Sequence, residues 1–231
     1  MHRAFVTGAT GYTGREVVRI LCEKGISTLA HIRHDSPRLE DWREHFGKLG
    51  APINASLWEE NTLTTTLGRI QPTLIFNLIG TTKARMKRQK DCSYEEVDYG
   101  LTALLLRTLQ HAVLTPKFIH LSAAGVNPNP KNDYYKAKWK AEKAVRESQL
   151  PYVIARPSFI IGSDRDDSRP FELWGARWID GALSVASWVG AREFSNRYRS
   201  TTNTILAQAL VRLALDSNAV NVIVESEQLR G

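Results

Sequence analysis

The sequence predicts a doubly wound α/β fold of the Rossmann type, in which one parallel sheet carries helices on both faces. Three observations support this prediction. An apolar strand at residues 4–6 is followed by a glycine-rich turn and an amphipathic helix. Strand-like and helix-like segments then alternate along the chain, which favours βαβ units. Residues 72–80 are nearly all apolar, as a central strand covered on both faces should be. The expected strand order is 3-2-1-4-5-6, with a small C-terminal addition.

Length and composition are those of a packed globular chain. The 231 residues, of which 42% are hydrophobic, are expected to form a single domain in which residues 157–202 make a substrate-side lid. Cys22 and Cys92 lack metal-ligand spacing, so we expect no metal site and a reducing, cytoplasmic setting. The first strand begins within three residues, and no apolar run reaches transmembrane length, so we expect neither a signal peptide nor a membrane span.

The chain is basic, with a formal net charge of +7. This charge suits a protein that binds a phosphorylated dinucleotide or an anionic substrate. Aromatic and basic residues are not interleaved as they are on a nucleic-acid platform, so we expect a small-molecule substrate and no nucleic-acid partner.

Hydrophobic periodicity and turn residues place the remaining elements. The first helix is expected to begin near residue 16. Further helices are expected at 37–49, 59–69, 93–112, 134–147 and 204–215. Further strands are expected at 27–33, 52–57, 72–80, 118–122, 151–155 and 221–225.

The glycines of the first turn follow the spacing Gly8-x-x-Gly11-x-x-Gly14. Glycines allow a tight turn and a close backbone approach, and the helix N-terminus that follows offers N–H groups to a pyrophosphate. The sequence therefore predicts a dinucleotide-binding loop, although a glycine pattern alone also fits an ordinary tight turn.

Arg33 ends the second strand, about 20 residues after the last glycine of the loop. A carboxylate at this place binds the ribose hydroxyls of NAD, whereas an arginine accommodates the 2′-phosphate of NADP. We therefore expect a preference for NADP(H) over NAD(H). Asp35, two residues later, could still reach a ribose, and Arg33 could instead be a solvated residue at a strand end.

The central strand ends in Gly80-Thr81-Thr82, small residues that let a ligand lie across the carboxyl edge of the sheet. Residues 83–90 then form a basic loop, which is either a rim that attracts anions or a solvated loop.

A set of three residues, at the end of the fifth strand and on the helix that follows it, has a recognisable chemistry. Ser122 ends that strand, and Tyr134 and Lys138 follow at i, i+4 on one helix. A tyrosine can pass a proton to or from a substrate oxygen, a nearby ammonium favours its phenolate, and a serine hydroxyl can hold a carbonyl. The alternative is a surface helix at 134–147 with incidental lysines.

Together with Arg156-Pro157, these motifs resemble the short-chain dehydrogenase/reductases in their atypical or extended branch, and most closely the oxidoreductases related to the Tat-interacting protein. The resemblance implies an NAD(P)-binding Rossmann domain with a Ser-Tyr-Lys site. Where family members carry an aspartate near adenine, this chain has Ala55-Ser56-Leu57. The further cofactor-binding residues that the resemblance implies are Thr10, Tyr12, Thr13, Asn77, Gly80, Thr81, Lys138, Pro157, Ser158 and Phe159.

Two functions follow from this sequence. The first is an NADP(H)-dependent oxidoreductase that acts on a carbonyl or an alcohol; the alternative is a non-catalytic NADPH-binding regulatory or interaction protein, as some members of the group are described. Residues 171–190 are rich in aromatics and fit a lid, a dimer surface, an interfacial helix or plain core packing. The sequence leaves a homodimer open.

Overall fold

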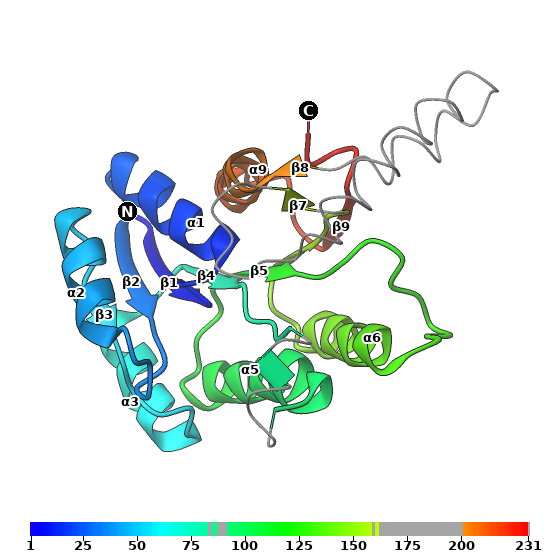
Figure 1. The fold of residues 1–231 in the computed structure, drawn as a ribbon, viewed down its shortest axis with the longest axis horizontal. Coiled ribbons are helices and arrows are strands. Elements are labelled where there is room, and N and C mark those ends of the chain that lie inside the picture. The colour runs from blue at the N-terminus through cyan, green and yellow to red at the C-terminus, as the bar shows by residue number, and fades with distance from the viewer. Residues whose placement is uncertain (83–84, 87–91, 159, 162–200, 231) are drawn as a thin grey trace.

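A computed structural model shows a seven-stranded parallel sheet between two layers of helices (Figure 1). It describes residues 1–82, 85–86, 92–158, 160–161 and 201–230. The strand order is β3-β2-β1-β4-β5-β6-β9, so the predicted order is confirmed and the last strand extends the sheet beside β6. A separate pair, β7 and β8, was not expected from the sequence. The strands are β1 (Arg3–Thr7), β2 (Ser27–His31), β3 (Ile53–Asn54), β4 (Leu74–Asn77), β5 (Lys117–Leu121), β6 (Tyr152–Arg156), β7 (Ile160–Ile161), β8 (Thr201–Thr202) and β9 (Val222–Glu225).

The helices agree with the expected segments, with two differences. The first helix begins at Tyr12, four residues before the expected start, because Gly11 caps it directly. The expected helix at 93–112 is divided into a π-helical turn and an α-helix. The helical elements are α1 (Tyr12–Glu23), α2 (Leu39–Lys48), α3 (Glu60–Ile70), η1 (Glu95–Gly100), α5 (Leu101–His111), α6 (Asp133–Glu147) and α9 (Asn203–Leu215).

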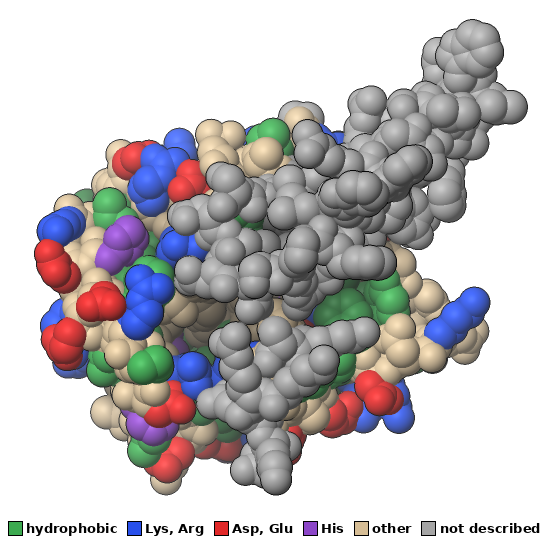
Figure 2. Space-filling view, in the orientation of Figure 1, with side chains coloured by type: hydrophobic (Ala, Val, Ile, Leu, Met, Phe, Trp, Pro, Cys, Tyr) green, Lys and Arg blue, Asp and Glu red, His purple; other side chains and the backbone are tan. Residues whose placement is uncertain are grey.

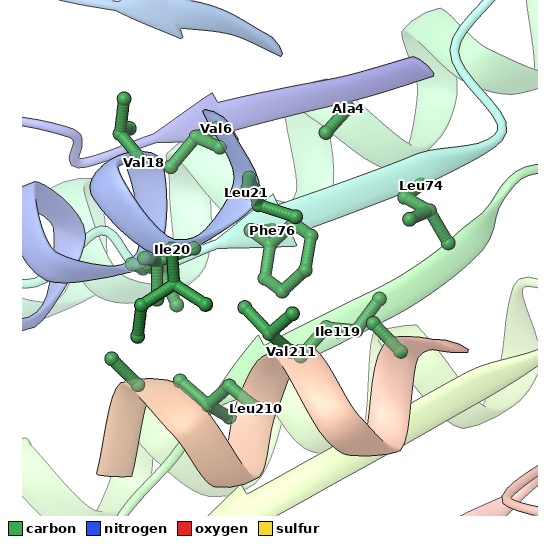
Figure 3. Close-up of a cluster of buried hydrophobic side chains, with 14 of the residues drawn as sticks. Ala4, Val6, Val18, Ile20, Leu21, Leu74, Phe76, Ile119, Leu210 and Val211 are labelled. Carbon is green, nitrogen blue, oxygen red and sulfur yellow. The ribbon is translucent and has the colours of Figure 1, made fainter. Parts of the chain in front are cut away.

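Each face of the sheet packs on its own hydrophobic cluster. Helices α1, α2 and α9 cover one face, where Phe76 and Ile119 of the sheet meet Leu21 of α1 and Leu210 of α9 (Figure 3). Helices α3, α5 and α6 cover the opposite face, whose cluster includes the buried Phe118 of β5. Burial on both faces explains why the strands read as continuous apolar runs.

Within the described residues, no helix combines the length and apolarity that a membrane crossing requires. On the face shown in Figure 2, basic and acidic side chains are interspersed over α2 and α3. The net positive charge is therefore not gathered into one patch on this part of the surface.

Candidate functional site

The glycine loop connects β1 to α1 at the carboxyl edge of the sheet. Gly8 has φ +69°, and a Cβ there would lie 2.5 Å from the Leu78 carbonyl oxygen. A Cβ at Gly14 would lie 2.2 Å from the Gly8 carbonyl oxygen. The Gly11 N–H donates to that same oxygen at 3.0 Å, which closes the turn. Side chains are thus excluded at Gly8 and Gly14, since the backbones already touch.

A cavity of about 170 Å³ opens over this loop. Gly11 caps α1 without any side-chain hydrogen bond, so the helix presents its N-terminal backbone and positive dipole end beside the cavity. Five predicted cofactor-binding residues are among those that line it. The described lining comprises Gly8, Thr10, Gly11, His31, Ile32, Arg33, Trp58, Leu78, Ile79, Gly80, Arg85, Val97 and Leu101.

Three other predicted loop residues belong to the first turn of α1 and have structural contacts. Thr13 and Gly14 are buried beneath the turn. The Tyr12 carbonyl accepts a hydrogen bond from the Asn203 amide at 3.4 Å, which ties the start of α1 to α9.

Arg33 follows β2 and lines the cavity, as expected, but it is not separate from Asp35. The Arg33 guanidinium lies 3.1 Å from the Asp35 carboxylate, and both side chains are partly exposed. The two residues that favour different cofactors in the sequence therefore form one ion pair, so the carboxylate is occupied by the arginine.

His31 and Trp58 give the cavity an aromatic wall that sequence reasoning missed. Their rings are 4.9 Å apart, edge to face, and the His31 Nε2 lies 3.2 Å from the Ser56 carbonyl oxygen. This wall stands beside residues 55–57, because Trp58 follows them directly and His31 contacts Ser56. The available signal was Trp58, a large aromatic directly after a strand that ends at the carboxyl edge.

Burial lowers the pKa of His31 to about 4, more than the hydrogen bond with Ser56 raises it. The free energy of unfolding should therefore fall as the pH drops from 6.5 to 4, because the unfolded chain binds a proton on His31 there and the folded chain does not. The loss from His31 is on the order of 3 kcal/mol and is complete below the folded pKa. Urea unfolding measured across this range tests the prediction.

His31→Gln should reduce the pH dependence over that range but not abolish it, because burial also lowers the pKa of His120, to about 3, and His120 remains. His2→Gln, at an exposed histidine, is the control variant. Equal slopes for wild type and His31→Gln would show that His31 is not the group responsible.

Ser122 lies at the end of β5 and is almost fully buried. Its hydroxyl donates to Oε1 of the fully buried Glu142 at 2.5 Å. The same carboxylate receives two hydrogen bonds from Arg156, at 2.9 and 2.7 Å. The Ser122 proton is thus directed to Glu142, and the hydroxyl has to rotate before it can donate to a substrate carbonyl.

Lys138 reaches from α6 to the end of β5, where its ammonium donates to the Leu121 carbonyl oxygen at 3.2 Å. Its Nζ also lies 3.0 Å from Oδ1 of Asp98, and both side chains are buried. Burial acts to lower the Lys138 pKa, but the charge of Asp98 and the nearby Tyr134 raise it overall. The structure therefore brings Lys138 beside Ser122 as a charged ammonium.

Tyr134 packs with its ring 5.1 Å from Tyr94 and 5.2 Å from Tyr135. Burial raises the Tyr134 pKa, and the opposing effect of Lys138 is smaller. The expectation that Lys138 would bring this pKa towards neutrality was therefore wrong for the protein without a ligand. The physical reason is burial of the phenol, which raises its pKa more than Lys138 lowers it, and the Asp98 carboxylate against the ammonium raises this pKa further.

Asp98 is a further site residue that sequence reasoning missed. It lies in η1, and a π-helical turn often marks a functional position. The Thr81 N–H donates to Asp98 Oδ2 at 3.0 Å, and a Cβ at Gly80 would lie 3.3 Å from Oδ1. The predicted residues Gly80 and Thr81 thus pass directly over the Asp98–Lys138 ion pair. The signal was a polar i, i+4 pair, Asp98 and Thr102, beside the apolar stripe of that helix.

Asn77 is fully buried beneath the cavity instead of on its wall. Its side-chain carbonyl oxygen accepts a hydrogen bond from the Thr7 hydroxyl at 3.0 Å, and its side-chain amide nitrogen donates to the Thr102 hydroxyl at 2.9 Å. The same nitrogen lies 3.1 Å from His120 Nδ1. Asn77 therefore fixes the end of β4 against its neighbours.

Pro157 is buried and its carbonyl accepts from the Ala124 N–H at 2.9 Å. The Ser158 hydroxyl accepts from Ser226 at 2.9 Å. Phe159, most of the expected lid at 157–202 and the whole aromatic segment 171–190 lie outside the described residues.

A doubly wound sheet with a glycine loop and a cavity at its carboxyl edge defines a Rossmann-type dinucleotide-binding protein. The chain belongs to the NAD(P)H-binding family, whose pattern matches residues 8–175.

Among curated proteins, the chain is 24% identical over 221 residues to the mitochondrial NADH-ubiquinone oxidoreductase 40 kDa subunit of Neurospora crassa, covering 95% of this chain and 54% of that protein. It is 28% identical over 211 residues to a ketoreductase of Stigmatella aurantiaca that acts on 4-hydroxy-2-methyl-3-oxo-4-farnesyl-3,4-dihydroquinoline-1-oxide, covering 80% and 60%. The chain thus spans little more than half the length of these relatives.

Solved structures support the fold. The Bordetella bronchiseptica enzyme WbmH in complex with NAD⁺ superposes with a TM-score of 0.66 at 18% identity, covering 94% of this chain and 72% of that one. UDP-glucose 4-epimerase from Thermotoga maritima gives 0.67 at 18% identity, covering 99% and 80%.

Proposed function

We propose that this protein is an NADP(H)-dependent oxidoreductase of the short-chain dehydrogenase/reductase type, related to the Tat-interacting-protein group, that acts on a carbonyl or alcohol of a small molecule. The observation that carries the proposal is the position of Lys138. Its ammonium contacts both the end of β5 beside Ser122 and Asp98 under the loop after β4. Lys138 and the glycine-loop cavity therefore lie at one edge of the sheet, since Gly80 lines the cavity and also lies beside the Asp98–Lys138 ion pair.

The residues at this edge fit a dinucleotide. A side chain is sterically excluded at Gly8 and Gly14, so the backbone itself faces the cavity with the α1 N-terminus beside it. Arg33 would hold the adenosine phosphate, and Lys138 would hold the nicotinamide ribose. NADP(H), when bound, supplies or accepts the hydride.

The protein's own residues would move the proton. Ser122 would orient the carbonyl oxygen, and Tyr134 would protonate the alkoxide that hydride transfer leaves. Because burial raises the Tyr134 pKa, the tyrosine is protonated at neutral pH, which is the form needed for carbonyl reduction. Withdrawal of Lys138 from Asp98 would favour the phenolate required for alcohol oxidation.

Two free thiols, Cys22 and Cys92, support a reducing, cytoplasmic setting as part of this proposal. We also keep the assignment of residues 157–202 to the substrate side of a single domain. The homodimer stays a prediction.

The second candidate is a non-catalytic NADPH-binding protein. It is favoured by the Asp98–Lys138 ion pair, because burial raises the Tyr134 pKa more than Lys138 lowers it, and the Asp98 carboxylate raises this pKa further. The similarity to a subunit of NADH-ubiquinone oxidoreductase points the same way.

Tyr134→Phe separates the two functions. For an enzyme, NADPH-dependent reduction of a panel of aldehydes and ketones should fall about 10²- to 10⁴-fold, because the proton donor is lost. NADPH affinity should be unchanged, since the phenol hydroxyl is not part of the glycine loop. Tyr135→Phe, on the neighbouring position of α6, is the matched control and should keep turnover. Full turnover by Tyr134→Phe would remove Tyr134 from the mechanism, and tight NADPH binding with no reduction by wild type would favour the non-catalytic protein.

A further inference from the structure

The cavity over the glycine loop contains two guanidinium groups from different elements. Arg33 follows β2, whereas Arg85 lies in a short helical turn after β4. The Thr82 hydroxyl accepts the Arg85 N–H at 3.2 Å, and the Thr82 carbonyl accepts the Met86 N–H at 3.0 Å, so Thr82 fixes this turn. Of the basic loop at 83–90, only Arg85 and Met86 are described.

The two arginines influence each other. Burial lowers the pKa of the Arg85 guanidinium, and the positive charge of Arg33 lowers it further. Cys92, Asp35 and Asp98 act in the opposite direction on the Arg85 pKa; of these, Asp35 is paired with Arg33, and Asp98 is paired with Lys138. Two cations that share one partly buried cavity repel each other, and an anion placed between them attracts both and so offsets the repulsion.

We propose that Arg85 and Arg33 together bind the 2′-phosphate of NADP(H), which makes Arg85 a determinant of cofactor specificity. This inference rests on the proposed function, because it assigns one more residue to the same nucleotide site. A phosphate dianion matches two guanidinium groups, each of which can donate two parallel N–H bonds.

The position of the cavity favours the 2′-phosphate over the pyrophosphate. The end of β2 is where the adenosine ribose lies in a doubly wound fold, and Arg33 stands there. The pyrophosphate instead lies at the N-terminus of α1, where Gly11 offers backbone alone. The aromatic wall of His31 and Trp58 borders the same space and suits adenine.

Arg85→Gln tests the proposal by isothermal titration with four probes: NADPH, NADH, 2′,5′-ADP and 5′-AMP. The affinity for NADPH and for 2′,5′-ADP should fall about 10- to 100-fold, because a charged hydrogen-bond donor to the phosphate is removed. The affinity for NADH and for 5′-AMP should be unchanged. Arg85→Lys should give an intermediate loss, since an ammonium keeps the charge without the planar fork.

Arg69→Gln, at an exposed arginine of α3, is the matched control and should bind all four probes as wild type does. Equal weakening of NADPH and NADH by Arg85→Gln would assign Arg85 to the pyrophosphate and overturn the proposal. Unchanged binding of all four probes would also overturn it. Discrimination between 2′,5′-ADP and 5′-AMP that depends on Arg85 would uphold it even if no carbonyl is reduced, so failure of the oxidoreductase proposal is seen separately.

Discussion

Gly14→Ala is expected to abolish dinucleotide binding and to lower the free energy of unfolding by about 3 kcal/mol or more. The new Cβ would lie 2.2 Å from the Gly8 carbonyl oxygen and 2.9 Å from both the Cα and the carbonyl oxygen of Ala9. All three atoms belong to the backbone, so no side chain can rotate away to make room. The loop has to separate from the first turn of α1, which displaces the N–H groups that would face the pyrophosphate.

Urea unfolding followed by circular dichroism, together with an NADPH titration, measures both effects. Gly68→Ala is the matched control, since a Cβ at this position in α3 meets nothing within 4 Å. It should stabilise the protein by up to about 1 kcal/mol through helix propensity and leave binding unchanged. Wild-type affinity in Gly14→Ala would show that the loop yields without cost and that its contact with α1 does not shape the site.

Arg156→Met is expected to lower the free energy of unfolding by about 3–5 kcal/mol. Removal of the guanidinium leaves the Glu142 carboxylate, which is fully buried, without its cationic partner and with the Ser122 hydroxyl as its remaining described donor. An uncompensated buried charge is far more costly than the pair itself. Arg156 also pairs with Glu225 of β9 at 3.0 Å, so its loss weakens the attachment of the edge strand.

The double variant Glu142→Met/Arg156→Met should recover most of this loss, because neither charge is then left buried alone. Lys143→Met is the control on the same helix. Its pair with Glu147 is 3.8 Å long and more than half exposed on both sides, so the change should be below about 0.5 kcal/mol. A double variant as unstable as Arg156→Met would show that packing, and not the buried charge, determines the cost.

The order of the sheet could be predicted from the sequence because its signals are local. Apolar runs, glycine stops and alternating elements occur within short windows, and the handedness of parallel crossovers then leaves few topologies. The glycine loop and Arg33 were predicted for the same reason, since each is defined by its distance along the chain from one strand.

The details of the candidate site depend on contacts between distant segments, so the sequence could not supply them. Asp98, which pairs with Lys138 of another helix, lies in a π-helical turn within the segment that the periodicity predicted to be one continuous helix. The Ser122 hydroxyl donates to the Glu142 carboxylate, which lies 20 positions further along the chain. Neither contact has a repeating pattern that a window of sequence could reveal.

The packing of α1 against α9 also orders events during synthesis. Leu21 of α1, the helix after the dinucleotide loop, and Leu210 of α9 belong to one hydrophobic cluster, and the Asn203 amide donates to the Tyr12 carbonyl across 191 positions of the sequence. Contacts of such separation close late and slow the search for the native state. The loop therefore obtains its supporting helix only after the 191 positions that separate Tyr12 from Asn203 have been translated, so a ribosome-bound chain that ends before α9 presents an uncovered apolar face on α1.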